Sequence, residues 1–388
     1  MKPFLTSLMG SLPRSKDLMA LKRELKNDNS FLPKYQDELK KEYLQALSLQ
    51  ERYEIDILTS GELDRDNYVS FVASKLNGVS ELNMADLIEF MPNKKAFEKT
   101  LQILDVPSLS IKNAICTGKI SRNKSLVAGE MKFLKAHSTK PLKATLPGAY
   151  LLTRSLWLEG LSSKFYKNKI DLSKDILKVL KDELRELANL GVSIVQFDEP
   201  VLSEVVFLKG ETRSFMCAAL STRKDTAPEL EFASNLIKEI TNFGKNIGLK
   251  IGLHVCRGNW SKDESILLKG SYLPLIELFE DVLPDILFLE FSTPRAGEIK
   301  TLLQSTKISQ NCILGLGVIN PRNNEIESVE FILNLAKKAL KFIPKEKLWL
   351  NPDCGFATFA NRPVNSFEII EKKLNILNLA KKSLQKSF

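Results

Sequence analysis

The 388-residue sequence predicts an α/β protein whose single domain, residues 1–388, forms a (β/α)₈ TIM barrel. Short apolar runs alternate with longer amphipathic segments, which is the pattern of βα units around a parallel sheet. The apolar runs number eight, the strand count of this barrel. No glycine-rich phosphate-binding turn follows the first run, which favours the barrel over the alternative, a doubly wound open sheet.

The eight expected strands are spread over the whole chain. They are Phe4–Leu8, Ile55–Thr59, Leu142–Leu146, Ser193–Phe197, Lys250–Leu253, Ile286–Leu289, Ile313–Leu316 and Leu348–Leu350. The stretches between them carry apolar residues at three- and four-residue spacing, which predicts helices, for example at Leu172–Ala188, Pro228–Ile247 and Ser328–Phe342.

The chain is longer than a bare barrel, which takes about 250 residues. We expect most of the surplus in an insertion at Asp64–Lys140, between the second and third strands. Within that insertion, the segment Ile111–Ile120 predicts an extra strand or hairpin.

Composition and charge exclude several classes of protein. The net charge of +9 comes mainly from scattered lysines, whereas a nucleic-acid-binding surface would need a dense basic stripe interleaved with aromatic residues. No apolar stretch approaches the roughly 20 residues of a membrane helix, and Met1–Gly10 is expected to be a buried strand because no signal-peptide cleavage site follows it. The five cysteines are odd in number and widely spaced, which indicates a reducing compartment. We therefore expect a cytoplasmic protein with no nucleic-acid and no membrane partner.

Potential metal ligands lie where three expected strands end. His254 and Cys256 follow the fifth strand two residues apart and so share one side of the chain, Glu290 follows the sixth strand, and Cys354 follows the eighth. In a TIM barrel, functional side chains gather at the carboxyl ends of the strands. One histidine, two cysteines and one glutamate suit zinc, although each residue alone could equally be part of the core.

Ligands on separate strands indicate a catalytic zinc ion rather than a structural one, because a structural site would usually use closely paired C-x₂-C units. Glu290 is the weakest of the four candidates, and a substrate group could replace it. A thiol bound to zinc loses its proton near neutral pH and becomes nucleophilic. The pattern therefore predicts alkyl transfer to a thiol.

Further polar residues follow other strands. Asp198 and Glu199 could bind an amino group or act as acid and base, or they could form a surface turn ended by Pro200. Glu62 is either a ligand-binding carboxylate or an ordinary loop acid. Gly10–Arg14 offers backbone N–H groups and a hydroxyl that could hold a carboxylate, although alone it is only a turn. Cys217 and Cys312 are expected to be buried small residues.

With these residues assembled, the chain resembles the catalytic, carboxyl-terminal half of cobalamin-independent methionine synthases, as a short, single-barrel member. The stretches that carry the resemblance are Gly10-Ser11-Leu12-Pro13, Ser60-Gly61-Glu62-Leu63-Asp64-Arg65, Gln196-Phe197-Asp198-Glu199-Pro200, His254-Val255-Cys256, Leu289-Glu290-Phe291-Ser292 and Asn351-Pro352-Asp353-Cys354-Gly355-Phe356. They run in the family order and span nearly the whole chain.

The resemblance implies one zinc ion (Zn2+) per chain and homocysteine as the thiol. The zinc ligands it implies are His254, Cys256, Glu290 and Cys354. It also implies that the homocysteine ammonium group meets Glu62 and Asp198, and that its carboxylate meets the hydroxyl and backbone N–H groups of Met9, Gly10 and Ser11.

Two departures from the family concern the methyl donor. Members that use methyl-folate carry a tryptophan after the third strand, where this chain has Arg154, with Trp157 displaced. They also use a histidine after the seventh strand as a proton donor, and the corresponding segment Gly315–Arg322 contains none. Cys116 could mark an altered donor pocket or be a buried structural thiol. A methylated corrinoid (methylcobalamin or a corrinoid protein) is therefore expected to be the donor in preference to methyl-folate.

The expected function is zinc-dependent transfer of a methyl group to homocysteine, giving methionine. Alkyl transfer to or from another small thiol, as in coenzyme M-dependent relatives, is an alternative with the same chemistry. A metal-free barrel of the uroporphyrinogen decarboxylase type, and a protein that binds zinc or thiols without turnover, are alternatives from other classes.

Overall fold

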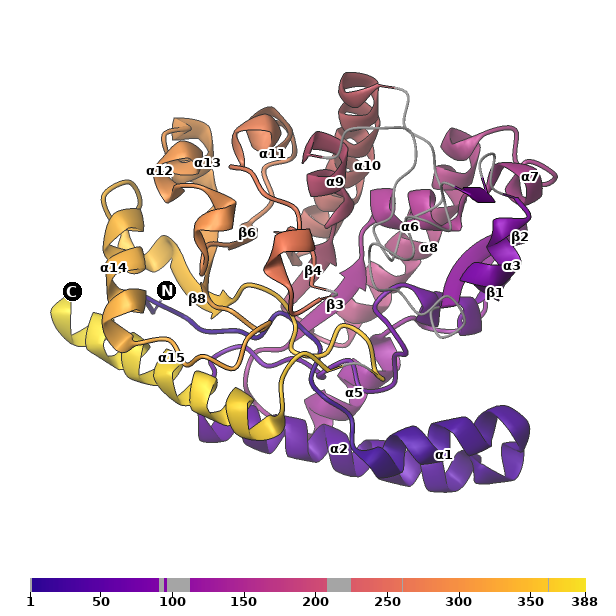
Figure 1. Ribbon diagram of the computed structural model, residues 1–388, viewed down its shortest axis with the longest axis horizontal. Helices are drawn as coiled ribbons and strands as arrows, with labels where there is room; N and C mark the ends of the chain where they lie inside the picture. The colour runs from indigo at the N-terminus through magenta and orange to yellow at the C-terminus, as the bar shows by residue number, and fades with distance from the viewer. Residues whose placement is uncertain (1, 91–93, 96–111, 208–224, 260, 362) are drawn as a thin grey trace.

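The computed structural model describes residues 2–90, 94–95, 112–207, 225–259, 261–361 and 363–388 (Figure 1). Its main sheet has six parallel strands in chain order, with helices packed outside it. The strands are β3 (Lys143–Pro147), β4 (Ile194–Asp198), β5 (Lys250–Val255), β6 (Ile286–Glu290), β7 (Ile313–Ile319) and β8 (Leu348–Pro352). The last six of the eight expected strands are confirmed, with ends that differ by up to three residues.

The first two expected strands form isolated bridges instead of regular strands. Parallel bridges join Ser7 to Ile57, and Thr6 to Leu350 on β8, while Leu58 pairs with Leu142 just before β3. A side chain replaces a neighbouring strand as the hydrogen-bond partner of the backbone here. Asp56 Oδ2 accepts hydrogen bonds from both the backbone N–H and the hydroxyl of Thr6, each at 2.8 Å. These substitutions interrupt the regular ladder that the apolar pattern predicted.

The helices alternate with the strands along the chain. The α-helices are α1 (Lys16–Asn27), α2 (Leu32–Arg52), α3 (Met84–Ile88), α5 (Ala128–His137), α6 (Ala149–Leu156), α7 (Glu159–Ser162), α8 (Lys169–Asn189), α9 (Val201–Phe207), α10 (Thr226–Asn246), α11 (Ile276–Val282), α12 (Ile299–Leu303), α13 (Thr306–Asn311), α14 (Val329–Ala339) and α15 (Phe367–Ser387). Short 3₁₀ turns lie at Asn29–Phe31, Ser70–Ser74, Glu264–Ile266, Leu273–Leu275, Pro294–Ala296 and Lys345–Lys347. The three helices named from the sequence are confirmed as α8, α10 and α14.

The segment expected to be an insertion contains a small sheet of its own. In it, β1 (Leu76–Asn83) pairs antiparallel with β2 (Lys112–Arg122). The strand expected at Ile111–Ile120 is therefore confirmed as β2, although Ile111 itself lies outside the described residues.

Two apolar clusters lie on opposite faces of the main sheet. Val195 and Phe197 of β4 belong to the large cluster that includes residues of the helices, whereas Ile194 belongs to a smaller cluster with Phe288 and Trp349. Because neighbouring residues of a strand point to opposite faces, Gln196 and Asp198 share the face of Ile194. The smaller cluster thus forms an apolar floor below the polar residues at the strand ends.

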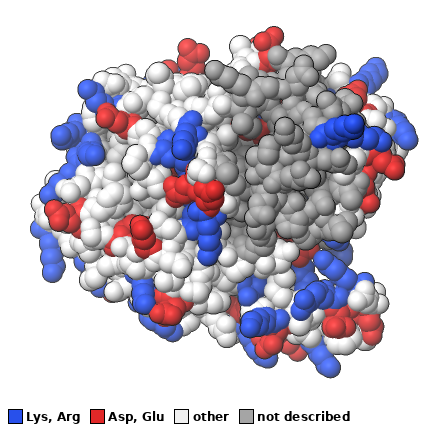
Figure 2. Space-filling view, viewed as in Figure 1, with Lys and Arg blue, Asp and Glu red and all other residues white. Residues whose placement is uncertain are grey.

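The surface carries both signs of charge. Figure 2 shows acidic side chains interspersed among the lysines and arginines on the described part of this face. Among the helices that the structure describes, none combines the length and apolar composition that crossing a membrane would require.

Candidate metal and substrate site

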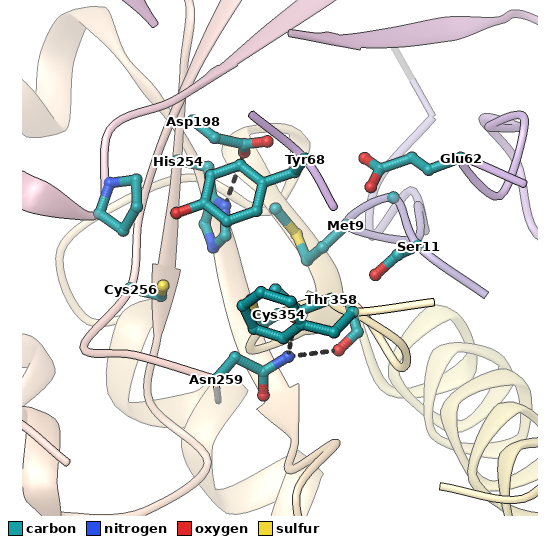
Figure 3. Close-up of a pocket in the computed structure, with 14 residues that line it drawn as sticks. Met9, Ser11, Glu62, Tyr68, Asp198, His254, Cys256, Asn259, Cys354 and Thr358 are labelled. Carbon is teal, nitrogen blue, oxygen red and sulfur yellow. Dashed lines mark hydrogen bonds and ion pairs between the residues drawn. The ribbon is translucent and has the colours of Figure 1, made fainter. Parts of the chain in front are cut away.

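A pocket of about 530 Å³, mouth included, lies at the carboxyl ends of the strands (Figure 3). Its lining residues are Met9, Gly10, Ser11, Glu62, Tyr68, Asp198, Pro200, His254, Cys256, Asn259, Cys354, Gly355, Thr358 and Phe359. The pocket therefore brings together three of the four expected metal ligands and all five residues expected to bind the substrate. In Figure 3, Glu62 and Ser11 enter from one side, His254 and Cys256 from the other, and Met9 lies between them.

The atoms of His254, Cys256 and Cys354 that could bind a metal ion all lie within 4.8 Å of one another. His254 Nδ1 lies 2.8 Å from Asp198 Oδ1 and donates to that carboxylate, while Nε2 lies 3.2 Å from the Asp353 carbonyl oxygen and is the nitrogen that a metal ion could bind. Burial alone would lower the pKa of His254, but the hydrogen bond and charge of Asp198 raise it to about 9. Asp198 therefore sets which nitrogen of His254 is available.

The two cysteine thiols share one hydrogen bond. The Cys354 thiol donates to Cys256, and this bond, opposed by burial and supported by the charge of His254, lowers the pKa of Cys256 to about 7. The same bond and burial raise the pKa of Cys354. Cys256 is thus the more readily ionised thiol of the pair, and a bound cation would favour loss of both protons.

Glu290, the fourth expected ligand, is not grouped with the other three. Its carboxylate lies 3.2 Å from Arg295, 3.7 Å from Arg257 and 3.8 Å from Arg322 at the guanidinium nitrogens. Burial would raise the pKa of Glu290, but the three guanidinium groups outweigh it and lower it. Glu290 is therefore an ionised carboxylate held by arginines, beside the metal-binding trio.

The two adjacent acids on β4 have different surroundings. Asp198 lines the pocket, whereas Glu199 is fully buried and accepts hydrogen bonds from the backbone N–H groups of Tyr150 (2.9 Å) and Leu151 (2.8 Å) at the start of α6. Gly148 allows this approach, because a Cβ there would lie 2.0 Å from Glu199 Oε1. Burial raises the pKa of Glu199 to about 8 despite these two donors. Glu199 is thus placed as a helix cap, outside the pocket lining.

The residues expected to bind the substrate carboxyl and amino groups are tightly packed. Glu62 has a φ of 55°, a left-handed conformation that is uncommon for glutamate, and its Oε1 accepts a 2.7 Å hydrogen bond from the Thr145 hydroxyl. A Cβ at Gly10 would lie 2.2 Å from Glu62 Oε1, so this position requires glycine. Similarly, a Cβ at Gly355 would lie 2.1 Å from Ser11 Oγ.

Burial and the charge of Arg65 act on Glu62 in opposite directions. Burial raises the pKa of Glu62 and dominates, while Arg65 lowers it. Strained backbone and a perturbed carboxyl in one pocket are features that gather at functional sites.

The residues discussed for the methyl donor lie apart from the pocket lining. Arg154 on α6 is buried and forms an ion pair with Glu204 at 3.2 Å, and Trp157 donates its indole N–H to Glu159 at 3.1 Å. Cys116 is buried on β2, where its thiol donates to the Gly118 carbonyl. These contacts favour structural roles.

The remaining two cysteines were expected to be buried. Cys312 is buried as expected, and burial raises the pKa of its thiol to about 11. Cys217 lies outside the described residues.

A family profile described as "Cobalamin-independent synthase, Catalytic domain" matches residues 4–367 of the chain. The chain belongs to this family. A methionine synthase of Sulfolobus acidocaldarius is 29% identical over 78% of this chain and 70% of its own length. A 5-methyltetrahydropteroyltriglutamate–homocysteine methyltransferase of Thermotoga maritima is 24% identical over 99% of this chain but only 45% of its own length. The chain thus spans less than half of this second relative.

A solved structure shares the fold. The B12-independent methionine synthase from Shewanella sp. W3-18-1, in complex with selenomethionine, has a TM-score of 0.71 and 21% identity, over 100% of this chain and 99% of that one. The family profile confirms the resemblance that the sequence motifs indicated, and the curated relatives identify the family as one of methyltransferases.

The sequence analysis did not predict four residues that line the pocket, namely Tyr68, Asn259, Thr358 and Phe359. Asn259 donates hydrogen bonds of 2.7 Å to the Gly355 carbonyl and to the Thr358 hydroxyl, and so joins the loop after β5 to the loop after β8. Tyr68 and Phe359 add aromatic surface to the pocket. Asn259 and Phe359 follow ligand-bearing strands within a few residues, a signal that could have found them, whereas Tyr68 lies in the expected insertion and carries no such signal.

Proposed function

We propose that this protein transfers a methyl group to the sulfur of homocysteine and releases methionine. The observation that carries the proposal is one pocket that is lined by a thiol–imidazole trio, a glycine-serine turn and the carboxylates of Glu62 and Asp198. A thiol with an ammonium and a carboxylate group at its other end matches these three sets of groups. The names of the curated relatives support the same substrate.

Zinc fits the donor set of the trio. Two sulfur atoms and one imidazole nitrogen are preferred zinc ligands, with bonds of about 2.0–2.3 Å. Atoms already within 4.8 Å of one another need only a small contraction to surround one ion. We propose His254, Cys256 and Cys354 as ligands and Glu290 as the fourth, which would have to turn partly away from its arginines.

The roles of the chain's own residues follow from these contacts. Glu62 and Asp198 receive the homocysteine ammonium group, while Ser11 and the backbone of Met9 and Gly10 receive its carboxylate. When bound, zinc lowers the pKa of the homocysteine thiol so that it reacts as a thiolate. The buried pocket excludes water and holds the sulfur in one direction for in-line attack.

We propose a methylated corrinoid as the donor. The chain has two histidines, of which His254 belongs to the pocket. The other, His137, is exposed on α5 and stacks on Phe133 with ring centroids 4.2 Å apart. The segment after β7 offers Asn320 in its place, whose amide donates to Glu264 at 2.6 Å. A departing folate nitrogen needs a proton and these residues provide no imidazole for it.

With a corrinoid donor, no such proton is needed. A sulfur–carbon bond forms while the carbon–cobalt bond breaks, and the electron pair of the broken bond stays on cobalt. The relatives that are named for methyltetrahydropteroyltriglutamate make methyl-folate the competing donor.

We also propose that the sheet closes into an eight-stranded barrel that forms one domain, with residues 64–140 as an insertion. The isolated bridges support closure, because they connect β8 to the segment around Thr6, that segment to Ile57, and Leu58 to the start of β3.

A donor screen tests the proposed function. Purified protein with homocysteine would be assayed for methionine with methylcobalamin, methyl-folates and S-methyl compounds. We expect methionine from methylcobalamin and about one zinc ion per chain, and we expect both to be lost in Cys354→Ser. Rapid turnover with methyl-folate would refute the donor, and undiminished activity of metal-free protein would refute the site. Turnover only with another small thiol would favour the second candidate function.

A further inference from the structure

A buried lysine lies below the pocket. Lys143 on β3 has no exposed surface, and its ammonium group lies 4.3 Å from the centroid of the Phe288 ring in the apolar floor. Its Nζ donates one hydrogen bond to the Leu8 carbonyl and another to Gln196 Oε1, each at 2.6 Å. A lysine in such surroundings is costly, which is a reason to ask what it does.

Lys143 determines which way the Gln196 amide points. A lysine ammonium group can only donate hydrogen bonds, so the amide turns its oxygen toward Lys143. The amide nitrogen then faces the other way, where it donates to the Met9 carbonyl and to Asp198 Oδ1, each at 2.8 Å. With the amide reversed, its nitrogen would face the lysine and its oxygen would face two acceptors.

Both ends of this network reach the pocket. Leu8 and Met9 form the backbone that leads into Gly10 and Ser11, on the carboxylate-binding side. Asp198 Oδ1 accepts from Gln196 and also from His254 Nδ1. One amine is thus joined, through one amide, to the turn and to the carboxylate that orients His254.

We propose that Lys143 is a positioning residue that acts through Gln196 to align the Met9–Ser11 turn with Asp198 for homocysteine binding. This role rests on the proposed function. Burial lowers the pKa of Lys143 to about 7 against the charges of Asp198 and Glu62, and even the neutral amine can donate both hydrogen bonds. In that state both N–H groups of the amine are used, and the Met9 carbonyl and Asp198 keep the Gln196 amide nitrogen on their side.

The test compares Lys143→Met with Lys373→Met. Lys373 is also fully buried, and it donates to Glu327 at 3.1 Å from α15, so it serves as the matched control for the loss of a buried lysine. Calorimetry with zinc-loaded protein would give the Kd for homocysteine, and steady-state assays would give KM for homocysteine and for methylcobalamin.

We expect Lys143→Met to raise the Kd and KM for homocysteine about tenfold, with zinc content and the KM for methylcobalamin unchanged. Lys373→Met should change none of these. A purely structural role of Lys143 would lower the active fraction without this selective rise in KM.

A second variant keeps the inference open to refutation if Lys143→Met does not fold. Gln196→Glu retains an acceptor for Lys143 but loses the two hydrogen bonds donated to Met9 and Asp198, so it should also weaken homocysteine binding. Unchanged homocysteine affinity in either folded variant would overturn the role of Lys143 alone. A wild-type protein that binds zinc but no homocysteine would overturn the proposed function and this role with it.

Discussion

Replacing Asp198 by asparagine separates substrate binding from metal binding. Asp198 Oδ1 accepts hydrogen bonds from His254 and Gln196, each at 2.8 Å. The asparagine carbonyl oxygen can accept both, so His254 keeps its orientation. The amide nitrogen then takes the place of Oδ2, where the ammonium group of homocysteine would need an acceptor.

The expected loss can be estimated from that one contact. A hydrogen bond to a charged group contributes about 1.5–3 kcal/mol. Since about 1.4 kcal/mol corresponds to a factor of ten, Asp198→Asn should raise the Kd for homocysteine about 10- to 150-fold. The pKa of His254 should also fall from about 9, because the charge of Asp198 adds to its hydrogen bond in raising it. Zinc should remain bound, although its affinity can fall by about 10- to 100-fold.

Calorimetric titration of homocysteine into zinc-loaded protein measures this loss, with zinc content determined on the same samples. Asp281→Asn is a suitable control, because Asp281 forms an ion pair with Lys238 on the partly exposed outer surface. Homocysteine affinity within twofold of wild type in Asp198→Asn would refute the assignment of Asp198. Complete loss of zinc would refute the claim that the asparagine carbonyl preserves His254.

Three further changes test other parts of the site. Gly10→Ala would place a Cβ 2.2 Å from Glu62 Oε1, so kcat/KM for homocysteine should fall roughly a hundredfold in steady-state assays. Glu290→Gln leaves its arginines without their shared carboxylate, so unfolding experiments should show a loss of about 3 kcal/mol, and zinc affinity should fall. The folded-state pKa of Lys143 is lowered from 10.5 to about 7, so its contribution to stability is greatest above pH 10.5 and falls as pH drops to 7. Relative to Lys143→Met, wild type should therefore gain about 3 kcal/mol of unfolding free energy between pH 7 and pH 9.5 in denaturant titrations; an unchanged difference would refute the lowered pKa.

Much of the sheet could be predicted because the apolar runs of β3 to β8 are buried on both faces. The first two runs are also largely apolar, yet they form only isolated bridges. The reason is a pair of hydrogen bonds in which the Asp56 carboxylate accepts from the Thr6 backbone N–H and the Thr6 hydroxyl accepts from the Asp56 backbone N–H. The spacing of apolar residues in the sequence does not predict such contacts. Sequence periodicity therefore predicts which segments lie in the sheet, but it does not predict the hydrogen bonds that each segment forms.

The residues of the site that could be predicted are those that lie at the ends of strands. His254, Cys256 and Cys354 converge because parallel strands bring their carboxyl ends together. Glu290 and Glu199 follow the same rule, but Glu290 is held by Arg257 and Arg322 and Glu199 by the start of α6, partners that lie far away in the sequence. Adjacent acids look alike in a sequence, and only tertiary contacts separate them.

Part of the Lys143–Gln196 network could have been predicted from the sequence. Lys143 is the one charged residue of a buried strand, and Gln196 precedes Asp198 by two residues and so shares its face. Their connection through the interior could not be predicted, because it depends on the register of β3 with β4, in which Thr145 pairs with Gln196.

The central claim is that homocysteine sulfur meets a metal held by His254, Cys256 and Cys354. The most direct test is the absorption spectrum of cobalt-substituted protein as homocysteine is added. We predict a new sulfur-to-metal charge-transfer band that saturates with homocysteine, and that does not form with serine, which has the same amino and carboxyl groups but no thiol. An unchanged spectrum, in protein that has taken up one cobalt ion per chain, would contradict the account.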